Sequence, residues 1–162
     1  MVEFKRLTDD FSVAPQLAPE DFARAAAAGF VAVVNNRPDG EEPGQMTTAQ
    51  AEAAAREQGL AYHHAPVVGG QLTMDAIETL KQATAEAGGP VLAYCRSGTR
   101  SATLWAVATA MDGAMGTDDI VKAAGDAGYD LTSLAGSLDQ LAQGGQSPGG
   151  QSPGGQSPGG QS

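Results

Sequence analysis

Two short apolar runs constrain the fold more than any other feature, because each lies between two segments of helical pattern. These runs are Phe30–Val34 and Pro90–Tyr94, and their nearly continuous apolar character is typical of strands buried on both faces. A third strand is predicted over Leu60–Val68 and an edge strand over Glu3–Phe11. Helices are predicted over residues 17–28, 48–58, 74–87, 101–111, 117–128 and 131–141. The sequence therefore predicts an α/β fold, with a parallel sheet of four or five strands flanked by helices.

The C-terminal segment differs in composition from the rest of the chain. From Gly144 onward the sequence repeats Gly-Gly-Gln-Ser-Pro and contains no apolar or charged side chain. Such a segment buries too little surface to offset the entropy lost on ordering. We therefore predict one folded domain over residues 1–143 and a disordered tail over residues 144–162.

The charge and the cysteine content narrow the classes of partner. Nine Lys and Arg residues stand against 19 Asp and Glu residues, which gives a net charge of −10. So acidic a chain repels phosphate backbones and anionic lipid surfaces, which argues against nucleic acid and membranes as partners.

No signal peptide and no apolar stretch of about 20 residues is visible. The single cysteine excludes an intramolecular disulfide, and without clustered ligands neither a metal nor a cofactor is expected. A lone thiol favours a reducing cytoplasm.

That cysteine, Cys95, opens a strand-to-helix loop whose composition favours an ionised thiolate. Backbone N–H groups in a tight loop and the N-terminus of the next helix both attract negative charge. Arg96 and Arg100 add two permanent cations, and Gly98 allows a tight turn. We predict Cys95 as nucleophile and Arg100 as its catalytic partner. The rest of the anion-binding loop is predicted to be Arg96, Ser97, Gly98, Thr99 and Ser101.

The loop resembles those of two families of thiolate enzymes. Rhodanese-type sulfurtransferases use Cys-Arg-x-Gly-x-Arg/Thr, which Cys95–Arg100 matches. Cysteine-dependent tyrosine and dual-specificity phosphatases place five residues between Cys and Arg, whereas four separate them here. A transferred sulfur atom needs a smaller cradle than a tetrahedral phosphoryl group. Loop length therefore favours sulfur transfer.

Three longer segments, Gln16–Phe22, Gly29–Glu42 and Cys95–Ser101, resemble the beta-lactamase-hydrolase-like family. This resemblance implies the dual-specificity-phosphatase architecture, and it implies that Arg37 and Asp39 line the same cleft as Cys95. Arg37 would then be either a second anion contact or a partner for Asp39. The acidic cluster of Asp39, Glu41 and Glu42 is interpreted as a solvated face rather than a metal site.

Two residues that a dual-specificity phosphatase uses are absent. The stretch Ala65–Gly70 contains no acid to protonate a leaving oxygen, and Tyr94 stands where a histidine usually precedes the cysteine. Asp75 falls in the first turn of a predicted helix. Of the neighbours His63 and His64, at most one can face the site, because adjacent strand residues point to opposite faces. His64 is retained as a candidate cleft residue.

These observations leave three hypotheses about function. The preferred one is a sulfurtransferase that carries sulfane sulfur as a Cys95 persulfide, with a small anionic donor and a thiol acceptor. The alternative is a phosphatase with Cys95 as nucleophile and a phosphate ester as substrate. The third is a non-enzymatic module that senses an anion or a redox state.

Overall fold

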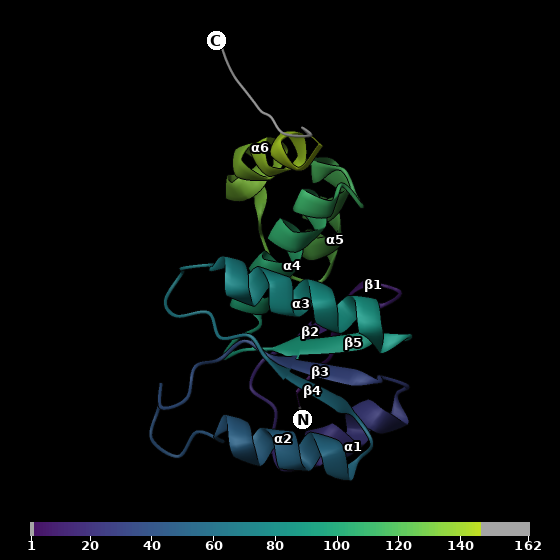
Figure 1. Ribbon diagram of the computed structural model, residues 1–162, viewed down its shortest axis with the longest axis vertical. Coiled ribbons are helices and arrows are strands. Elements are labelled where there is room, and N and C mark those ends of the chain that lie inside the picture. Colours follow the sequence, from purple (N-terminus) through teal and green to yellow (C-terminus); the bar gives the residue numbers. More distant parts are fainter. Residues whose placement is uncertain (1, 147–162) are drawn as a thin grey trace. The chain divides into compact units, whose positions relative to one another are not determined.

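The computed structural model describes residues 2–146. Its centre is a five-stranded sheet of β1 (Lys5–Thr8), β2 (Phe11–Ala14), β3 (Ala32–Asn35), β4 (Ala61–His64) and β5 (Val91–Tyr94) (Figure 1). The strand order is β1-β2-β5-β3-β4. Only β1 runs antiparallel to its neighbour, whereas the other four strands are parallel. The predicted α/β fold with a mainly parallel sheet is confirmed.

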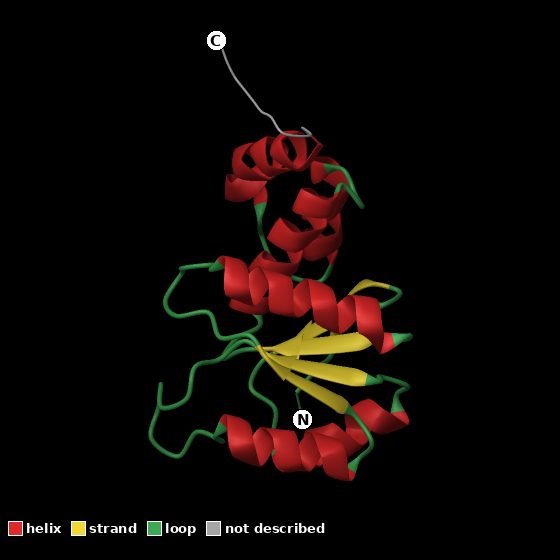
Figure 2. Ribbon diagram, viewed as in Figure 1, coloured by secondary structure: helices red, strands yellow, loops and turns green. Residues whose placement is uncertain are grey.

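Six α-helices accompany the sheet: α1 (Pro19–Ala27), α2 (Thr48–Glu57), α3 (Met74–Ala87), α4 (Thr99–Asp112), α5 (Thr117–Asp126) and α6 (Ala135–Gln146). The described chain divides into two compact units, with the boundary between Trp105 and Ala106. In the first unit, α1 and α2 cover one face of the sheet and α3 covers the other (Figures 1 and 2). In the second unit, α5 packs against α6, which follows a short 3-10 turn over Thr132–Leu134. None of the helices within residues 2–146 combines the length and the apolar character needed to cross a bilayer.

The first unit has a core on each face of the sheet because successive strand residues point to opposite sides. Leu92 and Tyr94 share one face with Val33, which lies opposite Leu92 in the register. These three side chains pack into a buried cluster with Phe22 of α1, whose ring meets Tyr94 edge to face. On the other face Phe11 stacks on Trp105 of α4. Burial raises the pKa of Tyr94 far above the usual tyrosine range, so Tyr94 is a neutral core residue.

Two sequence predictions about the elements need correction. Residues 3–11 were expected to form one strand, but the chain turns at Asp9–Asp10 and forms the hairpin of β1 and β2. The helix expected over 131–141 begins as the 3-10 turn and continues as α6 to Gln146. The predicted limits of 1–143 and 144–162 stay predictions, because the structure describes nothing of the repeats beyond residue 146.

The loops that carry the site leave the carboxyl ends of the parallel strands. β2, β3, β4 and β5 end at Ala14, Asn35, His64 and Tyr94, which are aligned across the sheet. The following loops therefore meet at one edge of the sheet, where Figure 2 shows them gathered. In open parallel sheets this edge is the usual place for a ligand.

Candidate active site

Cys95 follows β5 directly and lies at the base of the loop that leads into α4. Its side chain is fully buried, and its sulfur accepts a hydrogen bond from the backbone N–H of Gly98 at 3.1 Å. Gly98 has φ +97°, in the left-handed region that other residues rarely adopt. This conformation lets the loop fold back on itself, so that a backbone donor points at the sulfur. Such a donor stabilises negative charge on the thiolate.

Ser101 and Asn36 connect this loop to two others through buried hydrogen bonds. The Ser101 hydroxyl donates to Asn36 Oδ1 at 2.7 Å, and Asn36 Nδ2 donates to the carbonyl of Ala65 at 2.8 Å. The backbone N–H of Asn36 also donates to the carbonyl of Tyr94 at 2.8 Å. The side chains of Asn36 and Ser101 are both fully buried. Asn36 thus joins the loops that follow β3, β4 and β5, and it directs the Ser101 proton away from the sulfur.

Arg100 is held by a two-point ion pair that the sequence did not predict. Its Nη1 and Nη2 donate to the two carboxylate oxygens of Glu41 at 2.8 and 2.9 Å, and Nη1 also donates to the carbonyl of Val67 at 2.6 Å. The hydrogen bond to Glu41 raises the pKa of Arg100 although burial opposes it, and the nearby Cys95 acts in the same direction as Glu41. Within residues 2–146, Nε and one N–H of Nη2 have no protein acceptor. This edge of the guanidinium can therefore bind an oxyanion at two points.

Arg37 is a buried structural cation rather than a free anion contact. Its side chain is 2% exposed, and its three nitrogens donate to Glu41 at 2.7 Å, Gln16 at 2.8 Å and Glu42 at 2.5 Å. Burial opposes this charge, but the hydrogen bonds that Arg37 donates to Glu42 and Glu41 outweigh it and raise the pKa of Arg37. Of the two roles considered, pairing with Asp39 is not what the structure shows. Arg37 instead fixes the loop that carries both glutamates.

Asp39 and His64, the other two candidate cleft residues, have structural partners. A carboxylate oxygen of Asp39 accepts from the backbone N–H of Thr48 at 2.8 Å, at the start of α2. A negative group is favourable at that helix terminus. The Nε2 atom of His64 is bonded to the carbonyl of Arg37 at 2.9 Å. Both contacts fix the course of the 37–48 segment.

The other predicted loop residues, Arg96, Ser97 and Thr99, are exposed to solvent. Arg96 is 68% exposed and reaches Glu42 at 3.3 Å. Ser97 and Thr99 are also exposed, and their hydroxyls are hydrogen-bonded to each other at 3.2 Å. The structure therefore brings Cys95, Gly98, Arg100 and Ser101 together on the inner side of the loop.

Four residues that hold the site loops together were not among the predicted site residues: Gln16, Asn36, Glu41 and Glu42. Asp39, Glu41 and Glu42 are exposed, as the interpretation of a solvated face predicts, but Glu41 also contacts both Arg37 and Arg100. The sequence contains one signal that could have indicated them. Arg37, Arg96 and Arg100 lie in segments predicted to meet at one edge of the sheet. In a chain this acidic, their carboxylate partners had to come from a nearby loop, and Glu41 and Glu42 follow Arg37 closely.

The Glu41–Arg100 pair gives the fold a defined dependence on pH. The Arg100 hydrogen bond lowers the pKa of Glu41 below its usual range. A depressed carboxyl pKa stabilises the fold above the unfolded-state value, about 4.3 for glutamate, and this stability is lost as the pH falls through the folded-state value. In denaturant titrations, the free-energy gap between the wild type and Glu41→Gln should be constant from about pH 6 to 8 and shrink below about pH 4.3. A gap unchanged down to about pH 3 would contradict a charged pair.

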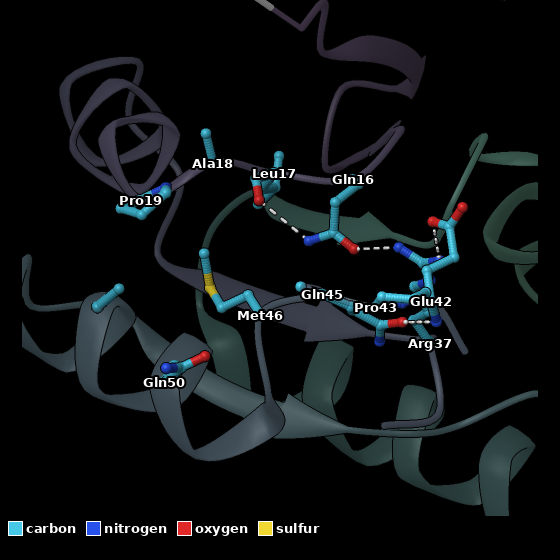
Figure 3. A pocket seen from close by; sticks show the side chains of 12 residues that line it. Gln16, Leu17, Ala18, Pro19, Arg37, Glu42, Pro43, Gln45, Met46 and Gln50 are labelled. Carbon is cyan, nitrogen blue, oxygen red and sulfur yellow. Dashed lines mark hydrogen bonds and ion pairs between the residues drawn. The ribbon is translucent and has the colours of Figure 1, made fainter. Parts of the chain in front are cut away.

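A cavity of about 660 Å³ lies between the segment before α1 and the segment leading into α2 (Figure 3). It is lined by residues 16–19, 42–46, Arg37, Gln50 and Ala54. Arg37 and Glu42 border the cavity and also belong to the ion-pair cluster described above. The backbone N–H of Gln16 donates to the carbonyl of Arg96 at 3.2 Å, which ties the cavity wall to the residue after Cys95.

Comparison with known sequences assigns the first unit to a described family. A sequence model described as "Beta-lactamase hydrolase-like protein, phosphatase-like domain" matches residues 3–112. The beta-lactamase hydrolase-like protein of Agrobacterium fabrum (strain C58) is 38% identical over 135 residues, which are 83% of this chain and 31% of that protein. The protein of the same name from Xylella fastidiosa (strain 9a5c) is 39% identical over 137 residues, 84% of this chain and 32% of that protein. The chain spans just under a third of the length of these curated relatives.

Comparison with solved structures gives the same fold. A proposed phosphatase from Neisseria meningitidis is 34% identical, with a TM-score of 0.74 over 85% of this chain and 97% of that one. A kinase-associated phosphatase whose catalytic-site cysteine is substituted by serine is 14% identical, with a TM-score of 0.63 over 88% of this chain and 96% of that one. At that identity the likeness concerns the fold alone. The match over residues 3–112 and the identity of more than a third place the chain in the beta-lactamase hydrolase-like family, to whose phosphatase-like domain it corresponds.

Proposed function

We propose that this domain is a cysteine-dependent phosphatase that hydrolyses small phosphate monoesters, with Cys95 as the nucleophile. The observation that carries the proposal is the pairing of Arg100 with Glu41, which leaves one edge of the guanidinium for an oxyanion near the Cys95 sulfur. The loop amide of Gly98 supports the thiolate from the other side. The likeness to the proposed phosphatase from Neisseria meningitidis, at 34% identity, supports the choice of phosphoryl transfer.

The reaction proceeds in two displacements. The Cys95 thiolate attacks phosphorus, so that an S–P bond forms while the ester P–O bond breaks and the alcohol leaves with the bonding electron pair. Water then attacks phosphorus, the S–P bond breaks, and inorganic phosphate and the thiolate are released. Arg100 stabilises the charge on the equatorial oxygens in both steps. Because Ala65–Gly70 supplies no acid, the leaving group departs as an alkoxide or phenolate and takes its proton from water, so aryl esters with good leaving groups should be the better substrates.

Sulfur transfer is the second candidate, and the length of the loop favours it. Only four residues separate Cys95 from Arg100, and Gly98 N lies 3.1 Å from the sulfur, so the loop is tight. Here the thiolate attacks a sulfane sulfur, an S–S bond forms, and the donor leaves as sulfite or a thiolate. An acceptor thiolate then takes the outer sulfur and frees Cys95. This route needs no proton donor, and a lone reactive thiol suits a reducing compartment such as the cytoplasm.

Paired assays on the wild type and Cys95→Ser separate these functions. One assay follows phosphate release from an aryl phosphate, and the other follows sulfur transfer from thiosulfate to cyanide. We expect phosphate release that Cys95→Ser reduces by at least about 10³-fold, because the serine hydroxyl has no base to activate it. Sulfur transfer without phosphate release would overturn the proposal in favour of the second candidate. Saturable phosphate binding without either turnover would indicate a non-enzymatic sensing module.

A further inference from the structure

The cavity beside the Cys95 loop has the size and position of a site for an organic group. Its volume of about 660 Å³ lies within the usual range of small-molecule sites, about 300–1,000 Å³. Its apolar lining includes Leu17, Pro19 and Met46, which Figure 3 labels, and Ala54 of α2. The Glu42 carboxylate lies between Arg37 at the cavity and Arg96 of the catalytic loop. The cavity wall therefore contacts Arg96, the residue after Cys95.

The charges around the cavity select against polyanions. Arg37 is the only cation among its lining residues, and each of its nitrogens already binds Glu41, Gln16 or Glu42. No described lining residue therefore offers an unpaired positive charge, and the Glu42 carboxylate repels a second anion. A ligand with several phosphates would lose hydration in this cavity without gaining a partner. The occupant that fits is uncharged.

Among the polar side chains that line the cavity, Gln50 offers a hydrogen-bond donor to a ligand. The Gln16 and Gln45 carboxamides are engaged by the protein, through Arg37, Leu17, Pro38 and Glu42. Gln50 accepts from the backbone N–H of Thr47 through its oxygen, whereas its NH₂ group has no acceptor within residues 2–146. Figure 3 shows Gln50 on α2, beside Met46. Gln50 can thus donate a hydrogen bond to a ligand carbonyl.

We propose that this cavity binds the non-reacting part of the substrate: an uncharged, largely apolar organic group with a hydrogen-bond acceptor, joined to the anion that reacts at Cys95. The inference rests on the proposed function in one respect, namely that the anion of the substrate binds at Arg100. It excludes inorganic anions and polyanions as preferred substrates. A single reacting phosphate goes to the loop, and the organic body goes to the cavity.

Equilibrium binding tests this assignment without depending on turnover. Two non-hydrolysable phosphonates, one carrying phenyl and one carrying an anilide-substituted naphthyl group, are titrated calorimetrically into Cys95→Ser protein. We expect the larger ligand to bind at least about tenfold more tightly, and Ala54→Leu, which fills the cavity, to remove most of this preference. Ala53→Leu is the matched control, because Ala53 is the exposed neighbour on α2 and does not line the cavity.

A second variant keeps the test independent of how well a leucine fits at position 54. Gln50→Met preserves the shape of the side chain and removes the donor, so it should weaken the anilide ligand by about fivefold and leave a plain naphthyl phosphonate unchanged. Equal affinities of the phenyl and anilide ligands, or equal effects of Ala54→Leu and Ala53→Leu, would overturn the cavity assignment. If the preference holds but the wild type releases no phosphate from esters of the same groups, the cavity assignment stands and the phosphatase proposal fails.

Discussion

Replacing Arg100 with lysine is expected to lower kcat/KM for an aryl phosphate by about 10²- to 10³-fold, the loss that usually follows removal of a preorganised oxyanion donor. Lysine retains the charge but has neither the planar fork nor the five donors of arginine. It cannot bind the Glu41 carboxylate at two points, bond to the Val67 carbonyl and still offer two N–H groups to a phosphate. The loss should appear mainly in kcat, because the contact strengthens as charge moves onto the phosphoryl oxygens.

Arg96 provides the matched control in the same loop. It is 68% exposed and makes one ion pair, with Glu42 at 3.3 Å. Exposed pairs of this kind contribute about 0–1 kcal/mol, so Arg96→Lys should change kcat/KM by less than about fivefold. Because lysine keeps the positive charge, similar losses in both variants would show that the loop needs both guanidinium groups and would contradict a special role for Arg100. A normal rate for Arg100→Lys would overturn the prediction, because it would show that two-point binding by the guanidinium is not needed.

Asn36→Ala is expected to lower the free energy of unfolding by at least about 2 kcal/mol, because it leaves two buried groups without a partner. These groups are the Ser101 hydroxyl and the Ala65 carbonyl, which the Asn36 side chain binds at 2.7 and 2.8 Å. Ser101→Ala should cost less, since it leaves only the Asn36 oxygen unsatisfied. The double variant should lose less than the sum of the two single variants, because either change already breaks their shared bond.

Urea unfolding of the three variants and of Thr103→Ala measures these effects. Thr103 lies two residues beyond Ser101 on α4, and its hydroxyl donates to the carbonyl of Thr99 at the exposed side of the helix. Thr103→Ala should therefore stay within about 0.5 kcal/mol of the wild type. Additive losses in the Asn36 and Ser101 variants would show that the two side chains act independently. That result would contradict a single network joining the three loops.

Sequence reasoning succeeded where local signals act over a few residues. The prediction of a helix over Met74–Ala87 is confirmed to the residue, because Thr73 caps its start and Gly88, with φ +69°, ends it. The buried strand before Cys95 and the loop leading into α4 were likewise found from local pattern. The β1–β2 hairpin was missed because its turn consists of two aspartates without a glycine or proline to mark it.

The contacts that organise the site could not be read in the same way. Glu41 and Arg100 are 59 residues apart, and Ser101 and Asn36 are 65 residues apart. No periodicity links such pairs, because they meet only after the strands align their carboxyl ends. The nature of the cysteine loop was therefore predictable, whereas the identity of the carboxylate that holds its arginine required the fold.

The two-sided contacts of Glu41 and Arg37 have a consequence for cooperativity. Glu41 binds Arg100 and Arg37, and Arg37 binds Glu42 at the border of the cavity. The anion site and the cavity are thus the ends of one continuous chain of ion pairs. If occupation of one end shifts this chain, the affinity at the other end changes, and thermodynamic linkage requires the effect to be reciprocal. The two halves of one substrate would then bind as coupled ligands, each altering the affinity of the domain for the other.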